Sequence, residues 1–143
     1  MRNKLLQVAR GKRKLSIPTA GEMRLLQILW DREEATVEEV VSSHAEKERP
    51  NYKTTQTLLR IMEQKGFIAH ENRGRVFVFR PLVSRKTIDD LSVQALVSRN
   101  FNGSAAGLLI NLLESSSIKK KELDELEFLI REQRKRYELG DRE

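Results

Sequence analysis

Two groups of polar and basic side chains in the middle of this 143-residue chain have the types and spacing needed to bind a polyanion. A helix beginning near Asn51 would carry hydrogen-bonding and cationic groups along one side. These groups are Lys53, Gln56, Thr57, Arg60 and Gln64. Farther along, Arg73 and Arg75 flank the tip of a predicted hairpin. Amide and hydroxyl groups can read base edges and guanidinium groups can hold phosphates, so the pattern favours a nucleic-acid partner.

The elements that must position these side chains also have local signals. The other side of the same helix carries an apolar stripe formed by Thr55, Leu58, Leu59 and Met62. The side-chain oxygen of Asn51 can cap the helix start, and Gly66 stands where a left-handed closing residue is wanted. Two β-prone runs, residues 67–69 and 76–79, then surround a polar turn at residues 71–74, which predicts a hairpin.

Two further helices are expected upstream. Thr19 and Glu22 have the spacing of a capping box, and Thr36 and Glu39 repeat it. Pro50 then ends the second helix. The order helix, helix, helix, hairpin is that of a winged helix-turn-helix, in which the third helix enters the major groove and the wing touches the DNA backbone.

The positive charge is concentrated in two segments. Residues 51–86 hold eight basic and two acidic side chains, and residues 1–15 hold six basic and none that is acidic. A phosphate backbone is the partner that such an asymmetry most readily explains. The arm at residues 1–15 either follows phosphates or a minor groove, or is a disordered, solubilising tail.

After residue 82 the composition changes, and three more helices are predicted at residues 84–98, 105–113 and 119–136. The middle one, AAGLLINLL, is apolar nearly all round and needs cover that so short a chain cannot supply. We therefore expect a second copy to cover it. The predicted dimer interface contains Leu108, Leu109, Leu112, Leu126 and Ile130. The fold expected is mainly α with a small β-hairpin: a basic arm (1–15), a winged-helix domain (16–82) and a helical dimerisation domain (83–143).

Several functional classes are disfavoured. The chain has no cysteine, which excludes disulfides and thiolate chemistry, and no apolar run long enough to cross a membrane or to form a signal peptide. His44 and His70 stand on different elements with no carboxylate at ligand spacing, so no metal or catalytic site is expected. We expect a cytoplasmic protein that is not an enzyme and has no cofactor.

These motifs resemble the penicillinase-repressor family, the BlaI/MecI/CopY group, over about residues 16–135. The most specific stretches are LQILW, YKTTQTLLRIMEQKGFI and GRVFVFRP. The resemblance implies a homodimeric transcriptional repressor on a palindromic operator of double-stranded DNA. By position, the family's groove-facing residues correspond to Lys53, Thr54, Gln56 and Thr57, with Arg60, Arg73 and Arg75 expected on phosphates. Gln56 replaces an arginine that some members carry, which favours adenine over guanine at that contact.

The resemblance also bears on release from DNA. The absence of cysteine excludes the copper-responsive, cysteine-rich tail. The β-lactam-responsive branch is released when a membrane sensor protease is activated and an Asn-Phe bond is cut, and Asn100-Phe101 stands at the matching place between two predicted helices. The alternative is that Phe101 is only a core residue at a helix boundary and that no sensor exists.

Two other functions stay open at the level of sequence. A winged helix can be a protein-interaction module, although the basic face argues against it. A repressor of this kind can also be released by a small molecule held between its two domains, but no residue pattern identifies such a ligand.

Overall fold

The computed structural model describes residues 15–115 and 117–140. All but the last residue of the predicted basic arm therefore lies outside the described residues. The chain divides into two compact units, Met1–Val93 and Gln94–Glu143. The division falls eleven residues after the boundary expected at residue 82, and the predicted limits of the independently folding domains stay predictions.

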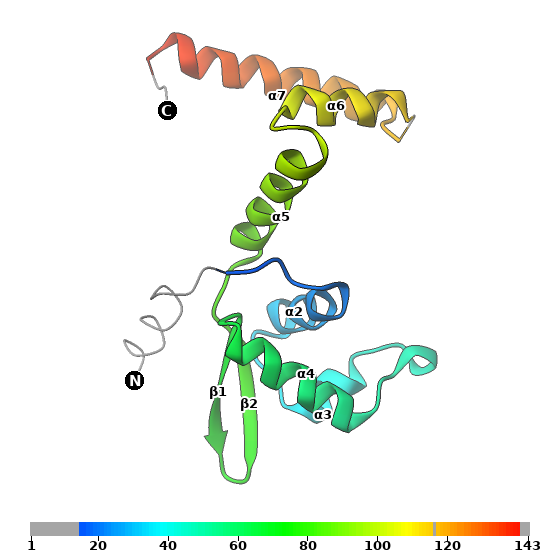
Figure 1. Cartoon of the computed structure of the whole chain (residues 1–143), viewed down its shortest axis with the longest axis vertical. Helices are drawn as coiled ribbons and strands as arrows, with labels where there is room; N and C mark the ends of the chain where they lie inside the picture. Colours follow the sequence, from blue (N-terminus) through cyan, green and yellow to red (C-terminus); the bar gives the residue numbers. More distant parts are fainter. Residues whose placement is uncertain (1–14, 116, 141–143) are drawn as a thin grey trace. The chain divides into compact units, whose positions relative to one another are not determined.

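The first unit is a winged helix, as predicted. Its elements are α2 (Ala20–Arg32), α3 (Val37–Ser42), a 3₁₀ helix (Glu46–Glu48), α4 (Tyr52–Gln64), β1 (Ile68–Arg73) and β2 (Val76–Pro81). Figure 1 shows α3 and α4 beside each other and the hairpin extending from the helical body. Helix α5 (Arg85–Asn100) begins in this unit and continues into the second.

The helices begin where their capping residues predict. The hydroxyl of Thr19 accepts a bond from the amide of Glu22, whose carboxylate accepts the Thr19 amide in return. Thr36 and Glu39 form the same reciprocal pair at the start of α3. Each box satisfies two amides that a helix start otherwise leaves without partners. The three helix starts expected in this unit are thus set by local sequence.

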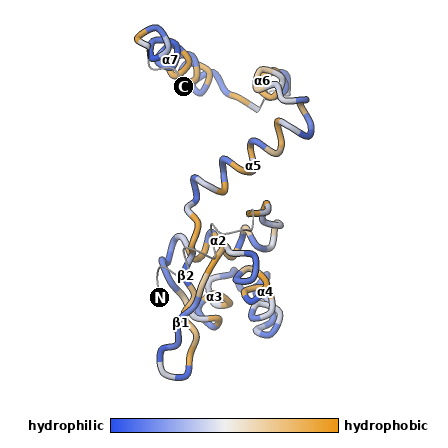
Figure 2. Tube along the Cα trace, turned by 60° about the vertical axis from the view of Figure 1, so that its left-hand side comes forward, coloured by the Kyte–Doolittle hydropathy of each residue, from blue (hydrophilic) through white to orange (hydrophobic). Residues whose placement is uncertain are grey.

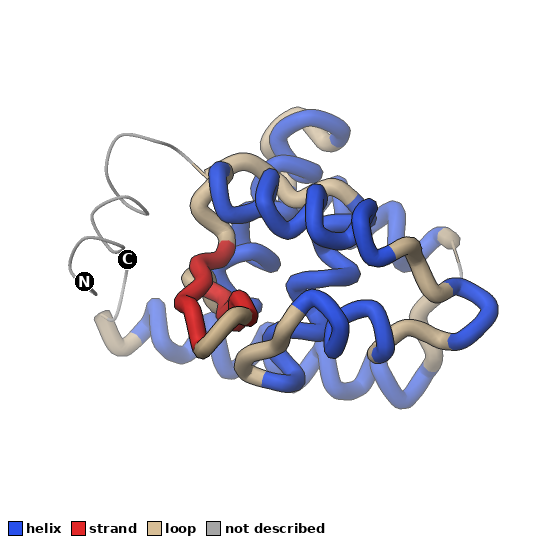
Figure 3. Tube along the Cα trace, turned by 90° about the horizontal axis from the view of Figure 1, so that it is seen from below, coloured by secondary structure: helices blue, strands red, loops and turns tan. Residues whose placement is uncertain are grey.

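The hairpin is longer than the sequence suggested. Residues 71–73 were expected in a polar turn, but they belong to β1, and the turn consists of Gly74 and Arg75 alone. Gly74 has a φ of +64°, which allows the chain to reverse within two residues. The ladder therefore pairs Arg73 with Val76 at its end. The strands, red in Figure 3, form the only sheet among the described residues.

A single core holds this unit together. Its members come from α2, α3, α4, the hairpin and the start of α5, and they include Leu26, Leu29, Val40, Leu59, Met62, Phe67, Ile68, Phe79 and Ile88. The loop between α2 and α3 also joins the hairpin edge, because the amides and carbonyls of Ala35 and Phe79 bond to each other at 3.0 and 2.8 Å. The root of the hairpin is thus part of the core.

One ion pair is embedded in this body. Glu22 is 2% exposed, and the Nζ of Lys65 lies 2.8 Å from its Oε2. Burial works to raise the pKa of Glu22, but the hydrogen bond from Lys65 and the Thr19 amide together hold that pKa below its ordinary value of 4.5. The pair joins the start of α2 to the residue that ends α4.

The second unit contains the end of α5, α6 (Ala105–Glu114) and α7 (Lys120–Glu138). Neither α6 nor α7 has a buried residue. Figure 2 shows hydrophobic colouring along both helices, and the side chains concerned include Ile110, Leu112, Leu113, Leu123, Phe128, Leu129 and Ile130. No described helix is long and apolar enough to cross a membrane.

We predict that Lys65→Ala lowers the free energy of unfolding by about 1–2 kcal/mol, because the variant leaves the buried carboxylate of Glu22 without its charged partner. The cost is below that of a fully buried pair because the Lys65 side chain is 36% exposed. Urea denaturation followed by circular dichroism measures it. Lys47→Ala, an exposed lysine on the 3₁₀ helix, is the control.

The same pair predicts a pH dependence. A lowered folded-state pKa at Glu22 stabilises the protein fully above about pH 4.5, and this contribution is lost as the pH falls through the folded-state value. The difference between wild type and Lys65→Ala should therefore shrink on acidification. An unchanged difference at about pH 7 and about pH 3 would contradict the assignment.

Candidate nucleic-acid interface

Helix α4 has one buried face and one exposed face. Thr55, Leu59 and Met62 are at most 2% exposed, whereas Lys53 and Arg60 point to solvent. The Asn51 side chain caps the helix by accepting the amides of Lys53 and Thr54, and Gly66, at φ +90°, follows its last turn. The predicted start, stop and core stripe are all confirmed, with Leu58 only half-buried.

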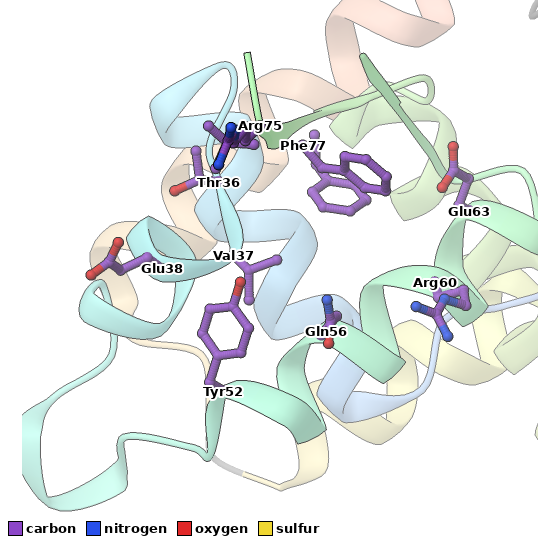
Figure 4. Close-up of a pocket in the computed structure, with 11 residues that line it drawn as sticks. Thr36, Val37, Glu38, Tyr52, Gln56, Arg60, Glu63, Arg75 and Phe77 are labelled. Carbon is purple, nitrogen blue, oxygen red and sulfur yellow. The ribbon is translucent and has the colours of Figure 1, made fainter. Parts of the chain in front are cut away.

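A groove of about 220 Å³ lies between α4 and the hairpin. Gln56 and Arg60 line it from α4, and Arg75 and Phe77 line it from the hairpin, as Figure 4 shows. Tyr52 closes one end and is 50% exposed. Two guanidinium groups, an amide and the carboxylates of Glu38 and Glu63 therefore share one concave surface that is open to solvent.

The remaining predicted residues of α4 lie on another flank. Lys53, Thr54 and Thr57 are all exposed and surround a shallow depression with Leu58 and Ile61. Because an α-helix has 3.6 residues per turn, these three side chains point in a different direction from Gln56, which faces the groove. The structure therefore brings Gln56, Arg60 and Arg75 together and places Lys53, Thr54 and Thr57 on the adjoining surface of the same helix.

The two arginines of the hairpin tip differ in their surroundings. Arg73 binds Glu34 through both terminal nitrogens at 2.6 and 2.9 Å and binds Glu71 through Nε at 2.7 Å. These hydrogen bonds, which Arg73 donates first to Glu34 and then to Glu71, raise the pKa of Arg73 and lower the pKa values of both carboxylates. Arg75 and Arg60 form no ion pair with any described residue.

The hairpin also contacts α4, through His70. His70 donates from Nδ1 to the carboxylate of Glu63 at 2.8 Å. The His70 ring also stacks on Phe77, with 4.0 Å between ring centroids and 15° between ring planes. The sequence showed no carboxylate at ligand spacing from either histidine, and the contact between Glu63 and His70 was not predicted. No described residues form a group of three or more side chains able to hold a metal.

The sequence model of the family described as penicillinase repressor matches residues 18–132, more than half of the chain. The chain belongs to the penicillinase repressor family. Members of the family are DNA-binding transcriptional repressors and not enzymes, and this repressor is one of them. The resemblance inferred from the motifs around α4 and the hairpin is thereby confirmed.

Individual relatives agree with this assignment. The repressor is 25% identical over 116 residues to the penicillinase repressor of Bacillus licheniformis, which covers 81% of this chain and 91% of the relative. It is 21% identical over 108 residues to the methicillin resistance regulatory protein MecI of Staphylococcus aureus strain N315, covering 76% and 88%.

Two solved structures are also similar. The DNA-binding domain of the repressor BlaI, in solution, is 26% identical with a TM-score of 0.46 and covers 52% of this chain and 90% of its own. The repressor CopR is 29% identical with a TM-score of 0.41 and covers 48% and 99%.

The predicted cleavage segment lies at the end of α5. Asn100 is the last residue of the helix, and the Phe101 amide still donates to the carbonyl of Val97 at 3.0 Å. The predicted helix ended two residues earlier, at Ser98. Asn102 and Gly103 then take positive φ values of 53° and 82° and end the helical path. The Asn100-Phe101 bond is thus part of a hydrogen-bonded helix end, whereas the sequence predicted that it lies between two helices.

The predicted dimer residues lie on α6 and α7. Leu108, Leu109 and Leu126 are half-buried, and Leu112 and Ile130 are exposed at 38% and 48%. A groove of about 400 Å³ is lined by leucines of both helices, by Ile130 and by charged side chains of α7. Within the second unit, these apolar side chains stay partly or largely exposed to solvent.

Two residues near the interface were missed by sequence reasoning. Glu34 lies 39 positions before Arg73, and no local spacing links them. Glu63 and His70 are seven positions apart, across the turn that joins α4 to β1. No pattern in the sequence marked this pair, and the contact is seen only in the folded chain.

Proposed function

We propose that the chain is a homodimeric repressor that binds a palindromic operator with α4 of each copy in the major groove. Lys53, Thr54, Gln56 and Thr57 contact base edges, and Arg60 and Arg75 hold the phosphate backbone. Membership of the family supports DNA binding and repression. The operator, the dimer and the release step are the parts that we propose.

The main support for this DNA-binding geometry is that one face of α4 is buried and the opposite face is exposed. Thr55, Leu59 and Met62 are locked in the core, so the helix can offer DNA only its outer face. That face carries donors and acceptors near the helix start and a cation farther along, as direct readout and backbone contacts require. The wing adds Arg75 on the same groove.

The unburied helices support dimerisation. Large apolar side chains of α6 and α7, Phe128 among them at 61% exposure, remain open in a single chain. Apolar surface gathered on two neighbouring helices marks an interaction site, and a symmetric second copy presents the complementary surface automatically. Charged residues at the groove edge, including Glu127 and Arg131, match the polar rim expected around such a contact.

Release by proteolysis has a structural requirement in this chain. Phe101 is half-buried, and its ring lies against Gly107, where an added Cβ would stand 3.5 Å from a ring carbon. A protease needs an extended backbone, so the last turn of α5 must open before the Asn100-Phe101 bond is cut. We propose that a membrane sensor protease, activated by a β-lactam-type signal, performs this cut. It would separate most of the second unit from the winged helix.

We predict that Gln56→Ala weakens binding to a palindrome selected from random-sequence duplexes by roughly 1–3 kcal/mol, with little change on mixed-sequence DNA. Arg75→Ala should weaken both and reduce the salt slope by about one unit, because one phosphate contact is lost. Fluorescence anisotropy at several salt concentrations measures both. Equal losses for Gln56→Ala on the two DNAs would show that Gln56 does not read a base.

Leu112→Asp should dissociate the dimer, because it places an unpaired charge in the proposed interface. A loss of roughly 100-fold or more in dimer affinity is expected. The substitution is tolerable in the isolated chain, where Leu112 is already 38% exposed. Sedimentation velocity reports the change. Asn111→Asp adds the same charge at the neighbouring position and is the control; equal dissociation by both variants would remove Leu112 from the interface.

A chain that ends at Asn100 should keep the winged helix, sediment as a monomer and lose about 10²–10⁴-fold in affinity for the palindrome. Two linked copies of α4 bind the second half-site as an intramolecular event, and separation removes that gain. A chain shortened only at Gly140 is the control. Palindrome binding by the Asn100 chain that equals the control would rule out cleavage at this bond as the release step.

A further inference from the structure

We infer that Arg73 is not a phosphate contact but a positioning residue. With Arg80, Glu34 and Glu71 it forms an ion-pair network, here called the wing brace, that fixes the hairpin tip against the helical body. The inference rests on the proposed DNA-binding function and assigns different roles to the two arginines of the tip. Arg75 is left to meet the phosphates.

Three of the five N–H donors of Arg73 are already used. All three of its nitrogens bind carboxylate oxygens at 2.6–2.9 Å, two on Glu34 and one on Glu71. Arg80 reaches the same two carboxylates, at 3.4 Å from Glu34 and 2.9 Å from Glu71. Two cations therefore balance two anions. A phosphate could bind the donors that face Glu34 only by breaking a bidentate, charge-assisted contact.

The hairpin register explains why these four groups meet. Glu71 and Arg73 are two residues apart on β1, and Arg80 stands opposite Ala69 on β2, so the three share one face of the hairpin. Glu34 precedes Ala35, whose backbone pairs with Phe79 at the hairpin edge. That pairing brings the Glu34 side chain to the same face. The brace thus extends from a backbone-anchored loop to the last ladder residue before the turn.

The tip needs such support. Val78 is the last β2 residue toward the turn that is buried, whereas Val76 and Phe77 are 49% and 47% exposed. A two-stranded hairpin is marginally stable without packing on at least one face. On its opposite face His70 and Phe77 stack, and His70 binds Glu63 of α4. The wing is therefore tied to α4 on one face and to the α2–α3 loop on the other.

Fixing the tip has a consequence for DNA. Arg75 follows Gly74 in the turn and lines the groove with Gln56 and Arg60. Its guanidinium can meet the backbone while Gln56 meets a base only if the tip holds its place relative to α4. A single exposed ion pair contributes little to stability. Exposed pairs contribute measurably when they form a network with a bidentate arginine, as they do here.

The test compares Arg73→Ala, Arg73→Lys, Glu34→Gln and, as the matched arginine control, Arg75→Ala. Amide hydrogen exchange of residues 71–78 is measured without DNA, and binding to a mixed-sequence duplex is measured across salt concentrations. We expect faster exchange in both Arg73 variants and in Glu34→Gln, but not in Arg75→Ala. Arg73→Lys keeps the positive charge but loses the planar guanidinium that binds Glu34 through two nitrogens. Its hairpin amides should therefore also exchange faster than in the wild type.

The sign of the Glu34→Gln effect on DNA binding decides between the two roles. Removing an anion next to a DNA-binding tip strengthens binding if only charge matters, whereas loss of the brace weakens it, by about three- to tenfold. Arg73→Ala should weaken binding similarly while keeping the wild-type salt slope. Combining it with Glu34→Gln should add little, because both substitutions break the same contact.

The opposite pattern overturns the inference: a salt slope reduced by about one unit in Arg73→Ala, tighter binding in Glu34→Gln, or unchanged exchange in either variant. The hydrogen-exchange measurement needs no DNA, so it tests the wing brace even if the wild-type chain does not bind duplexes. Failure of wild-type binding would count against the proposed function alone, and unaltered exchange would count against the brace alone.

Discussion

Burial of one face of α4 is the constraint on which the rest of the molecule depends. Leu59 and Met62 are fully buried and Thr55 nearly so, in a core shared with α2, α3 and the hairpin. A helix held in this way cannot turn about its axis without exposing those side chains to water. Its outer residues are therefore presented in one orientation. In the proposed complex, bases are therefore read by this fixed set of side chains and not by adjustment of the helix.

The same core orders the hairpin to different extents along its length. The Phe67 amide bonds to the carbonyl of Met62, and the Leu82 amide bonds to the carbonyl of Phe67, so the root is continuous with the end of α4. Toward the tip, apolar contacts give way to exposed ion pairs and a ring stack. Exposed pairs are screened by salt, whereas buried apolar contacts are not. The order of the tip therefore depends on weaker contacts than the order of the root.

The features predicted from sequence are those with local causes. The capping boxes at Thr19 and Thr36, the Asn51 cap and the apolar stripe of α4 each depend on residues within one or two helical turns. The length of β1 and the partner of Arg73 were not predicted, because each depends on pairing with another segment of the chain. Glu34 meets Arg73 only after Ala35 has paired with Phe79, and a linear pattern carries no trace of that pairing.

The second unit shows the same limit in another form. Its helices have local support, such as the Ser104 cap and the ion pairs Lys120–Asp124 and Arg131–Glu127. Those contacts are exposed and contribute a few tenths of a kcal/mol each. Helices of 10 and 19 residues with no buried side chain draw little stability from propensity alone. The proposed dimer would stabilise them by burying Leu109, Leu126 and their neighbours against a second copy. On the proposed dimer, folding of this unit and pairing of the two α4 helices become one equilibrium. Any event that opens the end of α5 then acts on DNA affinity through that equilibrium.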